Sequence, residues 1–251
     1  MDETNSELAK DTSGGQWFEA THWSNVLAAG QGESGRRSEA LEKLCRTYWE
    51  PLYAFVRRMG HEVPEAQDLT QSFFAHLLTG NRLQQVSPDK GKFRSFLLAS
   101  LKNFLADQRD RANTAKRGSG QATVPLDTEL AERHQAQDPG PDGTAEHIFD
   151  RRWALVILSQ ALARLREEFT RAGKERQFAE LSVFLSTEGS AEDYAAVAGR
   201  LQMTAGAVPV AVHRLRLRYR EAIRAGVANT VANPGEVDGE MRYLLELLCR
   251  G

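Results

Sequence analysis

Residues 193–223, DYAAVAGRLQMTAGAVPVAVHRLRLRYREAI, carry two rows of apolar residues on either side of a short turn. The rows consist of Tyr194, Val197, Ala198 and Leu201, and of Val208, Val212, Leu215 and Tyr219. Residues three and four positions apart lie on one face of an α-helix, so each row predicts an amphipathic helix. The residues QMT, 202–204, predict the turn that allows the two apolar faces to pack together.

The ends of these two helices carry capping signals. Ser190 followed by Asp193 predicts a capping box at the start of the first helix, and Thr204 is the expected cap of the second. Counted from Thr204, Pro209 is the fifth helical residue, where its missing N–H costs about 3 kcal/mol; a later helix start would place it in the first turn, where proline is harmless. The stretch predicts either a helix-turn-helix, with its second helix available to a DNA major groove, or an ordinary pair of packed helices.

Helical periodicity extends over most of the chain. Apolar residues recur at steps of three and four in 36–58, 64–78 and 93–105 and resume at 147, and no stretch alternates convincingly with period two. The residues from about 113 to 146 are rich in Gly, Pro, Gln and acidic side chains, as flexible linkers are. We therefore expect an all-α protein with two small helical domains joined by a flexible acidic linker. The expected limits are 16–117 for the first domain, 118–146 for the linker, 147–228 for the second domain and 229–251 for a C-terminal extension that contains a helix.

Composition limits the classes of function. The chain has 251 residues, 41% of them hydrophobic, and a formal net charge of −2, which argues against a free-standing nucleic-acid binder. Two distant cysteines without metal-ligand spacing, and the lack of a long apolar run, predict a cytoplasmic protein without membrane contact. Six scattered histidines, with no phosphate-binding glycine loop and no nucleophile setting, predict that the chain is not an enzyme and uses no metal or cofactor.

Charge is distributed unevenly along the chain. Eight Lys or Arg residues lie between positions 90 and 117, the linker is acidic, and six Arg residues lie between positions 200 and 224. Each basic run is able to neutralise phosphates, although a charge run is equally compatible with a solvated helix face. Any nucleic-acid surface must therefore be local.

Several segments, in order, resemble a bacterial RNA polymerase sigma factor of the extracytoplasmic-function (ECF) type. They are EAQDLTQSFFAHLL (65–78), GKFRSFLLASLKNFLADQRDRA (91–112), the acidic linker, and AEDYAAVAGRLQMTAGAVPVAVHRLRLRYREAI (191–223). The resemblance implies a first domain with the region-two fold, which docks on the polymerase clamp and melts the minus-ten promoter element. It also implies a region-four helix-turn-helix that reads the minus-thirty-five element, with the acidic linker along the polymerase RNA-exit channel.

The same resemblance implies which residues carry these contacts. The expected polymerase-binding residues are Asp68, Leu69 and Gln71. The expected minus-ten DNA-binding residues are Lys92, Arg94, Lys102, Asn103, Asp107, Arg109, Arg111, Lys116 and Arg117. The expected minus-thirty-five DNA-binding residues are Thr204, Ala205, Gly206, Pro209, His213, Arg214, Arg216 and Arg218.

Three features depart from the family pattern. Gln202 stands in a tight turn where many relatives have glycine, so a strained or altered turn is expected. Ser72 stands where a glutamate is common, and phosphorylation of Ser72 or of nearby Thr70 would restore negative charge there. The C-terminal extension has a helix start at Asn233 and Pro234. Its apolar stripe consists of Met241, Leu244, Leu245 and Leu248.

The expected partners are core RNA polymerase and promoter DNA, and an anti-sigma factor or a Ser/Thr kinase is a further candidate. We expect the C-terminal helix to pack on the second domain as an extension of its core, with restraint of DNA binding as the alternative. Two other classes stay open. One is a free-standing helix-turn-helix regulator, which binds duplex DNA without polymerase, usually as a dimer. The other is a degenerate sigma-like interaction protein that does not read promoters.

Overall fold

The structure is a computed structural model that describes residues 34–79, 92–114, 143–231 and 233–249. Within these ranges the chain is all-helical, as predicted, and contains no strand. The helices are α2 (Ser34–Arg58), α3 (Val63–Thr79), α4 (Phe93–Thr114), α6 (Ala145–Arg171), α7 (Glu175–Ser182), α8 (Ala191–Leu201), α9 (Ala207–Ala228) and α10 (Val237–Cys249). Two 3₁₀ turns, η3 (Val183–Leu185) and η4 (Pro234–Glu236), complete the order.

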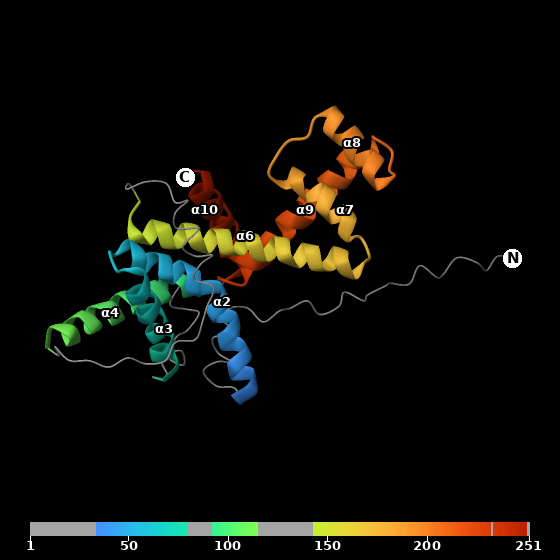
Figure 1. Ribbon diagram of the computed structural model, residues 1–251. Helices are drawn as coiled ribbons and strands as arrows, with labels where there is room; N and C mark the ends of the chain where they lie inside the picture. Colours follow the sequence, from blue (N-terminus) through green and yellow to red (C-terminus); the bar gives the residue numbers. More distant parts are fainter. Residues whose placement is uncertain (1–33, 80–91, 115–142, 232, 250–251) are drawn as a thin grey trace.

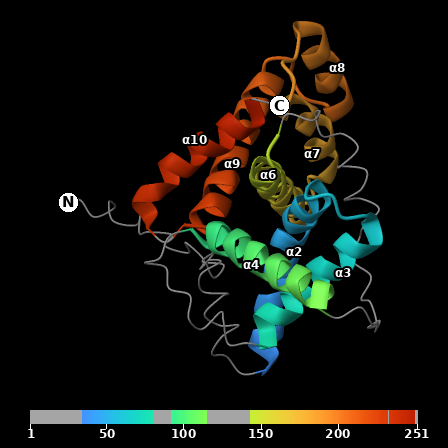
Figure 2. The ribbon, with the colours of Figure 1, turned by 90° about the vertical axis from the view of Figure 1, so that its left-hand side faces the viewer.

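Helix α6 is the element around which the others are arranged. It crosses the molecule, with α2 along its first half, α3 and α4 on the far side of α2, and α7 at its other end (Figure 1). Thr144 caps its start, because the Thr144 hydroxyl oxygen accepts a hydrogen bond from the backbone N–H of His147 at 3.2 Å. Viewed along the axis of α6, the helices α2, α9 and α10 surround it (Figure 2).

The first half of α6 lies in a core built mainly by the N-terminal helices. Phe149, Trp153 and Ile157 of α6 pack against apolar residues of α2, α3 and α4, and the ends of α9 and α10 close the same core. One aromatic pair in this core meets edge to face: the ring centroids of Tyr48 and Phe93 are 5.4 Å apart at an interplanar angle of 74°. The largest fully buried members from α2–α4 are Tyr48, Leu52, Tyr53, Phe55, Phe73, Phe93, Leu97 and Leu101.

The second half of α6 lies in a smaller core with α7, η3, α8 and α9. Leu165 and Phe169 of α6 pack there against the apolar faces of the later helices. The other buried members are Phe178, Leu181, Phe184, Val197, Ala198, Val208, Val212 and Leu215. One continuous helix therefore joins the two cores.

This packing crosses the boundary that we expected at residue 147. The apolar side chains of α6 recur along its whole length, and those near its start share a core with α2, α3 and α4 as well as with the ends of α9 and α10. The limits of the two domains and the flexible linker stay predictions, since 115–142 lie outside the described residues. The last residues of the expected linker lead into α6, where the Arg58 Nε–H donates a hydrogen bond to the Gly143 carbonyl at 3.1 Å.

The C-terminal helix differs in register from its prediction. Leu244 is buried as expected, but Leu245 is 55% exposed, and Val237 and Leu247 are buried in its place. Positions 237, 240, 244 and 247 follow steps of three and four, which bring them to one face of the helix. Helix α10 packs on α6 and α9, as expected, but it does so within the first core.

The shared core makes a stability prediction. Ile157 is 1% exposed, whereas Leu155, two residues away on the same helix, is 36% exposed. Ile157→Ala should lower the free energy of unfolding by about 2–5 kcal/mol, because it removes buried apolar volume and leaves a cavity. Leu155→Ala should cost less than about 1 kcal/mol. Urea denaturation followed by circular dichroism measures both, and equal losses would contradict this placement of α6.

Candidate nucleic-acid interface

The α8–α9 unit begins with the predicted capping box. The Ser190 hydroxyl oxygen accepts a hydrogen bond from the Asp193 N–H at 3.1 Å, and the Asp193 carboxylate accepts one from the Ser190 N–H at 2.9 Å. The bond from the Ser190 backbone, followed by that from its side chain, lowers the pKa of Asp193. The capping box thus satisfies the backbone N–H groups of Ser190 and Asp193, which defines where α8 begins.

Just before the capping box, Gly189 allows a close approach of aromatic rings. A Cβ atom at this position would lie 2.6 Å from the rings of Phe184 and Tyr194, so a larger residue would force them apart. These two rings pack against each other with centroids 5.1 Å apart. The segment that enters α8 is therefore held close to η3.

The turn between α8 and α9 is strained at Gln202, as the sequence suggested. Gln202 has φ 54° and ψ 40°, the left-handed conformation that favours glycine. It is the one residue other than glycine with positive φ in the described ranges. The Met203 N–H donates to the Ala198 carbonyl at 2.9 Å, which closes the end of α8 around this residue.

The start of α9 corrects the predicted cap and accounts for the proline. The helix begins at Ala207 with Gly206 at the cap position, so Thr204 does not cap it; instead the Thr204 carbonyl accepts from the Ala207 N–H at 3.0 Å. Pro209 is consequently the third helical residue. The first N–H groups of a helix have no partner within that helix, so proline removes no hydrogen bond at this position.

Apolar packing sets the angle between α8 and α9. Val208 is completely buried between the two helices and is flanked by Val197 and Ala198 of α8. Further along α9, Val212 and Leu215 continue the buried stripe as predicted. The unit thus consists of two packed helices joined by a tight turn, an arrangement that both a helix-turn-helix and an ordinary helix pair share.

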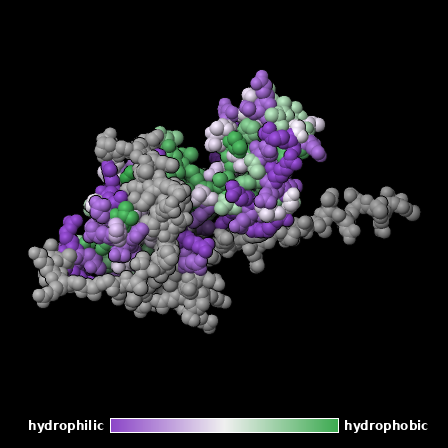
Figure 3. Space-filling model, viewed as in Figure 1, coloured by the Kyte–Doolittle hydropathy of each residue, from purple (hydrophilic) through white to green (hydrophobic). Residues whose placement is uncertain are grey.

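The outer face of α9 is exposed near its start. Pro209, His213 and Arg214 face solvent, and the Val210 side chain is 49% exposed. Beside them lies an open groove of about 630 Å³ whose apolar floor includes Phe169 and whose rim includes Arg214. On the visible face of the α7–α9 lobe, hydrophilic and apolar side chains lie next to each other (Figure 3).

Two of the arginines predicted to bind minus-thirty-five DNA already hold protein partners. Arg216 donates from Nε to the Phe184 carbonyl and from a terminal nitrogen to the Thr187 carbonyl, both at 3.0 Å, which ties η3 and the following loop to α9. These two bonds use part of the Arg216 guanidinium, whose side chain is exposed, so its role in DNA binding stays a prediction. Arg218 pairs with Glu168 and lies over the ring of Phe169 at 5.0 Å from its centroid. Arg214 has no ion pair among the described residues.

The residues predicted on α4 fall into two groups. Lys102, Asn103, Asp107, Arg109 and Arg111 are exposed along the second half of the helix. Within this exposed group, the Lys102 ammonium pairs with the Glu146 carboxylate at 2.5 Å, and this hydrogen bond is the main cause of the lowered pKa of Glu146. The last two predicted residues, Lys116 and Arg117, lie outside the described residues.

At the head of α4, Arg94 is buried and paired, unlike the exposed residues predicted further along the helix. It is 5% exposed and forms ion pairs with Glu240 of α10 and Asp150 of α6, so it does not face solvent in this structure. Lys92 pairs with the same Glu240. Sequence reasoning missed Glu240, although a single acid inside the apolar stripe of a helix was a usable signal, because such a residue needs a buried cation.

On α3, the predicted polymerase-binding residues share one segment but differ in exposure. Asp68 is exposed, whereas Leu69 and Gln71 are half-buried, Leu69 against the first core. Thr70 is completely buried, and its hydroxyl donates to the Ala66 carbonyl at 2.7 Å. Burial corrects the hypothesis that Thr70 is phosphorylated, because a kinase cannot reach it in the folded chain; Ser72 is exposed.

The left-handed turn makes a second stability prediction. Gln202→Gly should raise the free energy of unfolding by about 0.5–1 kcal/mol, because glycine adopts positive φ without steric cost. The matched control is Gln202→Ala, which keeps a Cβ atom and should give no gain. Thermal and urea denaturation compare the variants, and an equal gain for alanine would show that backbone strain is not the cause.

Comparison with known proteins adds no relative. No family model matches the chain, and neither the curated proteins nor the solved structures include a match. None of the helices in the described ranges combines the length and the apolar character that a membrane span requires. The cytoplasmic location stays an expectation.

Proposed function

We propose that the chain is an ECF-type sigma factor, which binds core RNA polymerase and directs promoter recognition, DNA melting and transcription initiation. The observation that supports this proposal is the α8–α9 unit, whose capping box, tight turn and buried Val208 are features that a helix-turn-helix needs. The segments that resemble the family also fold into separate helices, α3, α4 and α8–α9, each with an exposed polar face.

Helix α3 is proposed to contact the polymerase clamp. Asp68 projects a solvated carboxylate from a helix whose opposite face, including Phe73 and Leu77, is anchored in the first core. A carboxylate on a rigid helix suits a basic partner surface, since charge-assisted hydrogen bonds need a fixed geometry. Leu69 is proposed to contribute packing at the edge of this contact, and Gln71 a polar group.

The second half of α4 is proposed to hold the melted minus-ten strand. Its exposed side chains include the amide of Asn103 and the guanidinium groups of Arg109 and Arg111. Amide groups pair with base edges, and cations neutralise the phosphates of an unpaired strand. The aromatic residues Phe93 and Phe104 of the same helix are buried in the first core and therefore do not stack on bases in this structure.

The start of α9 is proposed to dock on duplex DNA mainly through phosphates. Pro209 and Val210 offer no side-chain hydrogen bonds to base edges, which leaves His213 and Arg214 as the nearest exposed polar groups. Since phosphate contacts carry no direct sequence information, this helix should tolerate more variation in the minus-thirty-five element than helices with polar residues at these positions.

A free-standing helix-turn-helix regulator is the second candidate. The α8–α9 unit is fully formed without polymerase, and the outer face of α9 is exposed, so duplex binding needs no further partner. The two candidates differ in one measurement. A sigma factor gives promoter-specific transcripts only with core polymerase, whereas a free-standing regulator protects a duplex site alone, usually as a dimer on paired half-sites.

The deciding experiment is reconstitution. Purified chain is mixed with core RNA polymerase and a library of promoter fragments, and transcripts that start at defined positions are mapped. Specific initiation supports the sigma function. Duplex protection without polymerase favours the regulator, and polymerase binding without initiation favours a degenerate interaction protein.

The contact on α3 can be tested separately. Asp68→Ala should weaken binding to core polymerase by about fivefold or more, because it removes a carboxylate from a basic interface. Glu65→Ala changes another exposed carboxylate of the same helix and serves as the control. Affinity is measured by fluorescence anisotropy, with circular dichroism to verify the helical content. If the two variants bind polymerase equally well, α3 does not make the contact proposed for Asp68.

Phosphate-dominated docking predicts the effect of a new cation on α9. Pro209→Lys should raise affinity for duplex DNA and steepen the dependence of log K on log salt by about 0.9, the value for one added phosphate contact. Leu217→Lys, at an exposed position of the same helix two turns further on, should have a smaller effect. Duplex titrations over a range of salt concentrations measure both slopes, and an unchanged slope for Pro209→Lys would exclude the proposed orientation of α9.

A further inference from the structure

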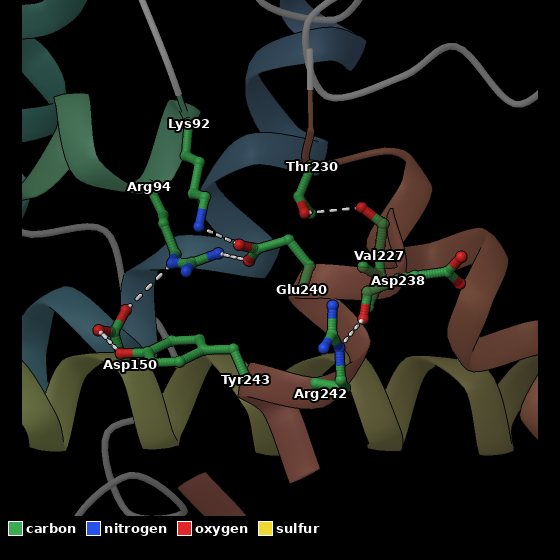
Figure 4. A network of polar contacts seen from close by, with 9 residues as sticks. All are labelled: Lys92, Arg94, Asp150, Val227, Thr230, Asp238, Glu240, Arg242 and Tyr243. Atoms are coloured by element: carbon green, nitrogen blue, oxygen red, sulfur yellow. Dashed lines mark hydrogen bonds and ion pairs between the residues drawn. The ribbon is translucent and has the colours of Figure 1, made fainter. Parts of the chain in front are cut away.

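Helix α10 brings an acidic side chain to the cationic head of α4, where Arg94 is buried and Lys92 is 38% exposed. The carboxylate of Glu240 lies between Lys92 and Arg94, with one oxygen paired to each cation (Figure 4). On the other side of Arg94, its Nε–H donates to the Asp150 carboxylate at 3.1 Å, and the Tyr243 hydroxyl donates to the same carboxylate at 2.6 Å. The Arg94 guanidinium is also stacked 4.5 Å from the ring centroid of Trp153 and 5.1 Å from that of Tyr243.

The partners of Arg94 come from two helices with different roles. Asp150 and Trp153 belong to α6, which is anchored in both cores, whereas Glu240 and Tyr243 belong to α10 near the end of the chain. Withdrawal of α10 would leave Arg94 oriented by α6 but open on the side that Glu240 occupies. Lys92 would lose its carboxylate as well, since Glu240 is the ion-pair partner that the structure gives it.

The contact of Glu240 with Lys92 and Arg94 resembles the way in which two cations hold a phosphodiester. A phosphodiester presents two anionic oxygens to neighbouring cations, and the Glu240 carboxylate presents two oxygens to Lys92 and Arg94 in the same way. Burial raises the pKa of Glu240, but the bonds from Arg94 and Lys92 outweigh it and hold the pKa below its ordinary value. The carboxylate is therefore anionic at neutral pH.

We infer that α10 is an autoinhibitory cover, in which Glu240 occupies a phosphate-binding site formed by Lys92 and Arg94 at the head of α4. This inference deepens the proposed function and rests on it, because α4 is the helix proposed to hold the unpaired minus-ten strand. The apolar residues Val237, Leu244 and Leu247 keep the cover closed in the isolated chain. DNA then binds only the open fraction, so its apparent dissociation constant is the intrinsic value divided by that fraction.

The test measures binding of a fluorescently labelled single-stranded oligonucleotide to the full chain. Glu240→Gln keeps the shape of the side chain but removes its charge, so it should raise affinity by about fivefold or more. The slope of log K against log salt should steepen by about 0.7 for each phosphate gained. Glu246→Gln makes the same change at an exposed position of the same helix and should alter neither value.

Two further variants separate the cover from other effects. Leu244→Ala loosens the apolar contact of α10 without changing any charge, and it should also raise the affinity for the oligonucleotide. This variant provides the test if Glu240→Gln does not fold. Adding Lys92→Gln to Glu240→Gln should abolish the gain, since it removes one of the proposed phosphate ligands. Hydrogen exchange of the α10 backbone reports opening directly and should be faster in Glu240→Gln and in Leu244→Ala than in the wild type.

Two results would overturn the inference. One is α10 exchange that is faster without any gain in affinity, and the other is α10 exchange that is unchanged in both variants. Binding of the wild type to core polymerase is measured in parallel, because it depends on α3. If the wild type does not bind core polymerase, the proposed sigma function is wrong. A gain in single-stranded DNA binding by the variants would still support the cover.

Discussion

The rest of the structure depends on the apolar face of α6, which is buried from one end of the helix to the other. Phe149, Trp153 and Ile157 lie in the first core, and Leu165 and Phe169 lie in the second. Each large apolar side chain that leaves water contributes about 1.5–3 kcal/mol, so these five together are comparable to the whole stability of an ordinary domain. Because one rigid helix carries both sets, the α8–α9 unit and the α2–α4 helices are held in a defined relation.

The polar contacts act within this frame and decide which charges remain free. Arg216 donates to two backbone carbonyls and Arg94 pairs with two carboxylates, whereas Arg214 faces solvent. A buried ion pair adds little net stability, but removal of one partner leaves an uncompensated charge, so such pairs specify an arrangement more than they strengthen it. The network at Glu240 accordingly selects how α10 sits on α4 and α6.

The proposed function and the inferred cover share α4, but the proposed function also depends on α3 and on the α8–α9 unit. The α8–α9 unit is a local arrangement of two consecutive helices, while Arg94 of α4 meets Glu240 of α10, far away in the sequence. A formal net charge of −2 does not conflict with local nucleic-acid surfaces, because basic residues are concentrated in particular helices.

The sequence by itself determined the helices and the α8–α9 unit. Capping at Ser190, the strain at Gln202 and the buried row through Val208 all depend on residues a few positions apart, which interact through the geometry of a single helix or turn. Only the tertiary structure decided that α6 is shared by two cores and that Thr70 is buried. It also decided that α9 starts late enough to accept Pro209, and that Arg94 meets Glu240, 146 positions away in the sequence. Charge and hydropathy patterns name the residue types that need partners, but which partner each receives depends on how distant helices pack, and no local spacing encodes that choice.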